Sequence, residues 1–145
     1  MKLSDERRNQ IIEETNKTGR MNLFPDELKE QAKDFPLYSQ DGLKEKAKVL
    51  VKYFNPQGVG EWIALEGSPE GDDFTFFGFC CLTEWEYGYF TLKQLTELQD
   101  KGIPIEIDLY CEGKTLEDML KINGEWEDYK ETFLKDDEEE EKEAD

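Results

Sequence analysis

Aromatic residues are concentrated in one stretch of this 145-residue chain, and this concentration is the strongest constraint on its fold. Eleven of the 18 Phe, Tyr and Trp residues lie between Tyr53 and Phe90. Large rings supply much of the apolar area that a small protein can bury, so the core is expected in this stretch. A chain of this length with 37 % hydrophobic residues supports one modest core, which predicts a single domain.

Short segments in and after this stretch alternate apolar and polar residues, with the period of two that is typical of strands. In residues 61–66, Trp62 and Ala64 face one side while Ile63 and Leu65 face the other. Residues 46–54 alternate apolar residues with lysines and precede an Asn-Pro-Gln-Gly turn, which predicts a hairpin with one solvated face. We expect further strands over residues 74–82, 85–90 and 105–110.

Helix signals flank these strands. We expect helices over residues 4–17, from Pro25 to before Pro36, from Thr91 through Leu98 and from Thr115 through about Ile122. A strand-rich centre with flanking helices predicts an α+β fold with a largely antiparallel sheet. We divide the chain into a weakly packed N-terminal helical extension (1–21), an α+β core domain (22–122) and an acidic C-terminal tail (123–145).

The charge is large and unevenly distributed. The formal net charge is −18; residues 1–54 carry a net +1, residues 55–135 a net −12 and residues 136–145 a net −7. This excess of acids argues against direct binding of duplex DNA, which requires a basic face. The like charges of residues 136–145 predict a disordered segment.

Several classes of function are excluded by residue types. The chain has no histidine, so it cannot build a Ser-His-Asp or Cys-His nucleophile or a histidine metal site. Cys80, Cys81 and Cys111 form no C-x-x-C pair and are expected to be reduced core thiols. No signal-peptide or membrane-spanning segment is found, so we expect a cytoplasmic protein without membrane contact. We expect no cofactor.

Two groups of acidic residues are candidate sites. A Gly- and Pro-containing segment, residues 67–73, is expected to be a loop; Glu70, Asp72 and Asp73 lie in it and Glu66 directly precedes it. Oxygen ligands could hold a hard cation there, but no EF-hand spacing is present, and we expect a solvated turn without a metal. On the strand around Ile107, Glu106 and Asp108 share one face. Paired carboxylates could support hydrolysis or metal-assisted phosphoryl chemistry if the sheet brought the two groups together.

Four segments of the chain resemble a family of small proteins catalogued only as a domain of unknown function and encoded by phages, plasmids and other mobile elements of bacteria. They are WIALEG (62–67), DDFTFFG (72–78), GYFTL (88–92) and GIPIEIDLY (102–110). The resemblance spans about residues 22–111. It implies a mobile-element origin and no particular chemistry.

Two hypotheses of function follow. In the first, the protein is a non-enzymatic acidic protein that binds a basic, nucleic-acid-binding surface of a host protein, as a DNA mimic inhibiting a defence or nucleic-acid-processing protein. Its partner-binding residues would be carboxylates of the core and of the tail: Glu66, Glu70, Asp72, Asp73, Glu106, Asp108, Asp136, Asp137, Glu138 and Glu139. The alternative is a carboxylate-based enzyme or metal-binding protein that uses Asp72, Asp73, Glu106 and Asp108.

Overall fold

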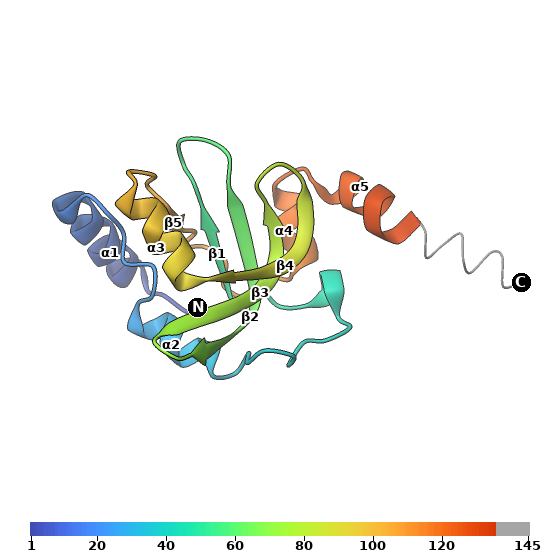
Figure 1. Cartoon of the computed structure of the whole chain (residues 1–145), viewed down its shortest axis with the longest axis horizontal. Helices are drawn as coiled ribbons and strands as arrows, with labels where there is room; N and C mark the ends of the chain where they lie inside the picture. Colours follow the sequence, from blue (N-terminus) through green and yellow to red (C-terminus); the bar gives the residue numbers. More distant parts are fainter. Residues whose placement is uncertain (136–145) are drawn as a thin grey trace, which may run out of the picture.

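The computed structural model of the protein describes residues 1–135 and confirms an α+β fold built on one antiparallel sheet (Figure 1). The strands follow the order β4-β3-β2-β1-β5. Their bounds are β1 Val51–Phe54, β2 Glu61–Glu70, β3 Asp73–Cys81, β4 Trp85–Thr91 and β5 Glu106–Ile107. The aromatic-rich stretch forms β1 to β4, as its composition predicts.

Helices lie on both faces of this sheet. They are α1 Asp5–Thr18, α2 Asp26–Ala32, α3 Leu92–Asp100, α4 Leu116–Ile122 and α5 Trp126–Tyr129, with a 3-10 turn η1 (Lys44–Lys46) and a π turn η2 (Lys130–Leu134). The Thr91 and Thr115 side chains cap α3 and α4 in capping boxes, as expected. None of the helices in the described part of the chain is long and apolar enough to cross a membrane.

The alternation in residues 61–66 separates two hydrophobic clusters, one on each face of the sheet. Trp62 and Ala64 lie in the larger cluster, which α1, α2 and α3 cover. Ile63 and Leu65 lie in the second cluster, which α4 and α5 cover. The predicted two-sided strand is therefore confirmed, and each face has its own layer of helices.

A β-bulge between Ala64 and Glu66 interrupts the pairing of β2 with β3. It turns the Glu66 side chain toward the face that Leu65 occupies, because Glu66, like Ile63, lies opposite a β3 residue of that face. Gly78 lies opposite Ala64, where an added Cβ would come within 1.9 Å of the Ile63 carbonyl oxygen. Only glycine fits this close approach of β3 to β2.

The strand predicted from residue 46 is shorter than expected. Residues 44–46 form η1, and regular pairing with β2 begins only at Val51. Val49 belongs to the second cluster and Val51 to the first, so the chain changes face near Leu50 rather than alternating regularly. Lys52, expected on a solvated face, is 6 % exposed, with its ammonium 3.3 Å from the Glu61 carboxylate.

The first 21 residues are packed on the core, contrary to the expected weak contact. Met1, Leu3, Ile11 and Met21 are all buried in the larger cluster. The sequence pattern is misleading because apolar residues are sparse along α1. Those that face the core are nevertheless buried in it.

The predicted acidic tail begins later than residue 123. Residues 126–134 form α5 and η2, and Tyr129 is buried in the second cluster with Trp126 and Phe133 packed against it. Aromatic side chains at these spacings share one helix face, and this periodicity outweighs the local excess of acids. The predicted disorder, together with Asp136, Asp137, Glu138 and Glu139, lies outside the described residues.

Candidate functional site

Glu66, expected to bind a partner, is instead a buried structural residue. Its carboxylate accepts hydrogen bonds from the backbone N–H groups of Tyr38 (2.9 Å) and Gln40 (2.7 Å), and the residue is 2 % exposed. The bulge in β2 aims the side chain under the segment of residues 38–40. A partner cannot reach this carboxylate while that segment is in place.

The segment of residues 67–73 is a strand hairpin rather than a loop, because β2 continues to Glu70 and β3 starts at Asp73. Asp72 lies 2.7 Å from the Lys93 ammonium, and this contact holds the pKa of the Asp72 carboxyl below its usual range. Asp73 accepts hydrogen bonds from the backbone N–H groups of Phe74 and Lys93, and Glu70 accepts one from the Thr75 hydroxyl. Asp72 and Asp73 therefore fasten the hairpin to the start of α3, whereas Glu70 bonds within the hairpin.

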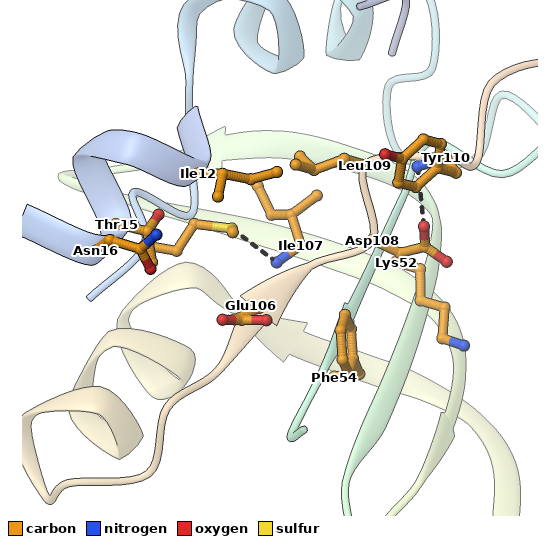
Figure 2. A pocket seen from close by; sticks show the side chains of 11 residues that line it. Ile12, Thr15, Asn16, Lys52, Phe54, Glu106, Ile107, Asp108, Leu109 and Tyr110 are labelled. Atoms are coloured by element: carbon orange, nitrogen blue, oxygen red, sulfur yellow. Dashed lines mark hydrogen bonds between the residues drawn. The ribbon is translucent and has the colours of Figure 1, made fainter. Parts of the chain in front are cut away.

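Glu106 and Asp108 line a hollow of about 500 Å³ between α1 and β5 (Figure 2). Asp108 accepts a hydrogen bond from the backbone N–H of Tyr110 at 2.9 Å, which shapes the turn after β5. The side chains of Ile12 and Leu109 point into the same space in Figure 2. The two sequence-predicted carboxylates therefore share a hollow, but one of them is occupied in stabilising a turn.

The two carboxylate pairs do not meet. Glu106 pairs with Phe54 and Phe54 with Glu61, whereas Asp73 pairs with Glu70 at the opposite end of β2. Since a strand rises about 3.3 Å per residue, these ends lie roughly 30 Å apart. The condition for a shared catalytic site is not met. Among residues 1–135, no group of three or more acidic or cysteine side chains is placed to hold a metal ion.

A different acidic site, which the sequence analysis missed, lies where the β3–β4 turn meets α5. Its walls are the rings of Trp85, Tyr129 and Phe133 around a pocket of about 410 Å³. Three carboxylates also line it: Glu84 from the turn, Glu125 just before α5 and Asp128 within α5. We call this the acidic aromatic pocket. The spacing of Trp126, Tyr129 and Phe133 is the sequence signal that could have revealed it.

The walls of this pocket are formed by closely packed aromatic rings. Phe79 stacks on Trp85 with ring centroids 5.0 Å apart and contacts Tyr129 edge-on at 5.4 Å, while Tyr129 stacks on Phe133 at 4.9 Å. The Tyr129 hydroxyl lies 2.7 Å from the Tyr87 hydroxyl and donates to Glu45 at 3.0 Å. Burial raises the pKa of Tyr87 to about 12 and also raises the pKa of Tyr129, so both hydroxyls stay protonated at neutral pH.

The pocket carries an uncompensated negative charge. Within residues 1–135, none of its three carboxylates forms an ion pair, while the nearby Lys121 and Lys130 pair with Glu117 and Glu127. Burial, followed by the charges of Glu61 and Glu125, raises the pKa of the adjacent Cys81 thiol. Aromatic walls with unpaired carboxylates suit a cationic ligand, and this pocket is the candidate functional site.

Comparison with known proteins identifies a family and no individual relative. A family model described as "Protein of unknown function (DUF2958)" matches residues 23–122. This match confirms the resemblance to an uncharacterised family and carries it past residue 111, through α4. No curated protein and no solved structure matches the chain. The matched region ends before α5, so part of the acidic aromatic pocket lies outside it.

Proposed function

The chain belongs to the DUF2958 family of proteins of unknown function, and from that premise we propose that it is a non-enzymatic protein that binds a basic, nucleic-acid-binding surface of a second protein. We further propose that it is encoded by a phage or another mobile element, acts in the cytoplasm, and inhibits a host defence or nucleic-acid-processing protein by occupying the surface that DNA would occupy.

The spread of the carboxylates is the observation that supports this function best. Asp72 and Asp73 lie at one end of the sheet, Glu106 and Asp108 at the other, and Glu84, Glu125 and Asp128 around the acidic aromatic pocket. A carboxylate enzyme built on Asp72, Asp73, Glu106 and Asp108 needs these acids to converge in one cleft, whereas a competitor of DNA needs carboxylates distributed over a surface. Duplex DNA itself presents one charge per roughly 1.7 Å of its axis.

The position of the remaining charge supports the same function. Residues 55–145 carry a net −19, of which −7 falls on residues 136–145 directly after the helix that forms the pocket. Because charges are screened over about 8 Å at physiological salt, such a surface attracts a basic partner mainly at close approach. We therefore expect strongly salt-dependent binding.

A competition experiment tests this function. Tagged full-length protein is used to capture proteins from bacterial lysate at low salt, and the captured proteins are eluted either with a salt gradient or with excess duplex DNA. We expect to capture DNA-binding proteins and to displace them from the tagged protein with duplex DNA. Each purified partner should lose its DNA binding as this protein is titrated in. Retention that ignores the DNA competitor, or partners that bind DNA equally well in the presence of this protein, would overturn the proposal.

A further inference from the structure

We propose that the acidic aromatic pocket binds the guanidinium group of an arginine side chain on a protein partner. This inference rests on the proposed function and adds to it the kind of side chain recognised. The pocket is open at its rim, where Glu84 and Asp128 are exposed, and closed at its base by the buried Phe79 and Tyr129. An extended side chain can enter such a pocket end-on.

The aromatic walls favour a planar cation. Trp85 and Phe133 are only half-buried although both pack on Phe79, so each keeps an exposed part of its ring at the pocket. A guanidinium stacks on such rings and forms paired hydrogen bonds with carboxylates, which an ammonium cannot do in the same way. Three carboxylates from two segments of the chain provide those acceptors.

A neighbouring ring already shows how this surface attracts cations. The ammonium groups of Lys121 and Lys130 lie 5.4 Å and 5.9 Å from the ring centre of Trp126. In residues 1–135, no lysine or arginine occupies the equivalent place over Trp85. The segment that follows in sequence, residues 136–145, has a net charge of −7. A cation on another molecule complements the charge of the pocket.

Nuclear magnetic resonance of the full-length protein tests the pocket directly, with the indole N–H of Trp85 as the probe and that of Trp62, which lies in the other hydrophobic cluster, as the internal reference. The ligand is a short glycine peptide with one central arginine and blocked ends, compared with the same peptide carrying neutral citrulline. We expect saturable shifts of the Trp85 signal and an affinity for the arginine peptide at least about fivefold tighter than for the citrulline peptide.

Matched charge variants separate the pocket from the net charge. Glu125→Gln with Asp128→Asn removes two carboxylates of the pocket, whereas Glu13→Gln with Glu97→Gln removes two exposed carboxylates elsewhere. We expect the first pair to weaken arginine-peptide binding about fivefold or more and the second to change it less than twofold. Circular dichroism confirms that both fold.

The outcomes distinguish the pocket from the proposed function. Equal binding of the arginine and citrulline peptides, or equal weakening by both double variants, overturns the pocket while leaving capture of DNA-binding proteins by overall charge intact. Conversely, selective arginine binding together with captured proteins that duplex DNA cannot displace supports the pocket and overturns the proposed function.

Discussion

Gln40 and Glu66 connect the segment of residues 38–40 to β2, through the Glu66 side chain and through the Gln40 side chain. The backbone N–H of Gln40 donates to the Glu66 carboxylate at 2.7 Å, and the Gln40 side-chain amide donates to the carbonyl oxygen of Leu65 at 2.7 Å. The same amide group also bonds both backbone groups of Lys48 at 2.8 Å. A residue without secondary structure of its own thus joins the bulge of β2 to the segment leading into β1.

Replacing Glu66 should therefore destabilise the fold rather than affect only partner binding. Glu66→Ala leaves the N–H groups of Tyr38 and Gln40 without their acceptor, and we expect a loss of about 2–3 kcal/mol in the free energy of unfolding. Glu70→Ala, on the same strand but exposed, should cost less than about 1 kcal/mol. Urea unfolding measures both, and equal losses would contradict the structural role of Glu66.

Two glycines that face each other across β3 and β4 should respond in opposite ways to alanine. At Gly78 the new methyl group meets the Ile63 carbonyl, so Gly78→Ala should lower stability by about 3 kcal/mol or more. At Gly88 nothing lies within 4 Å, and Gly88→Ala should be neutral or stabilising by up to about 1 kcal/mol. Thermal unfolding separates the two variants. Similar melting temperatures of the two variants would show that β3 and β2 leave room for a methyl group at position 78.

Adjacent isoleucines in α1 test whether the first 21 residues belong to the core. Ile11 is 6 % exposed and Ile12 is 40 % exposed. We expect Ile11→Ala to cost about 2–4 kcal/mol of stability because it leaves a cavity, and Ile12→Ala to cost less than about 1 kcal/mol. Chemical denaturation gives both values. If Ile11→Ala costs no more than Ile12→Ala, α1 is the weakly packed extension that its sparse apolar pattern suggests.

The linked tyrosines of the pocket should make stability sensitive to alkaline pH. Their pKa values are raised in the folded state, to about 12 for Tyr87, against 10.0 for a free side chain. A raised pKa means that the folded state favours the protonated form, so this stabilisation is complete below pH 10 and is lost as the pH rises toward 12. Tyr129→Phe should remove one late-titrating group.

Tyrosinate absorbance in the native protein measures this titration. We expect a late group of tyrosines that ionises as the protein unfolds, with one fewer late tyrosine in the Tyr129→Phe variant. Ionisation of all six tyrosines in a single step near the free value would show that the hydroxyls of Tyr87 and Tyr129 are not buried together.

The sequence predicts much of this fold where the signal is local. The two-sided pattern of residues 61–66, the caps at Thr91 and Thr115 and the aromatic strand around Phe76 all depend on neighbouring residues or on a short period. Such signals do not depend on the tertiary arrangement, because they hold in any fold that buries the apolar positions. The antiparallel sheet follows from them, because short turns connect β1 to β2, β2 to β3 and β3 to β4.

The functional residues depended on information that the sequence does not display. Glu66 and Glu70 look equivalent along the chain, yet the bulge buries one and leaves the other exposed. Likewise, a count of acids marks residues 123–135 as tail, although Tyr129 is buried. Overall charge masks a periodic apolar face when the two occur in the same segment.

The fold class, the place of the core, the negative charge beyond residue 54 and the absence of histidine chemistry follow from composition and short-range order, so they can be deduced from the amino-acid sequence. Three features emerge only from the folded chain: which carboxylates are buried, the position of Asp73 and Glu106 at opposite ends of the sheet, and the meeting of Glu84 with Glu125 and Asp128 at an aromatic pocket. Proximity between distant segments is set by strand order, register and packing, and none of these is a property of one segment alone.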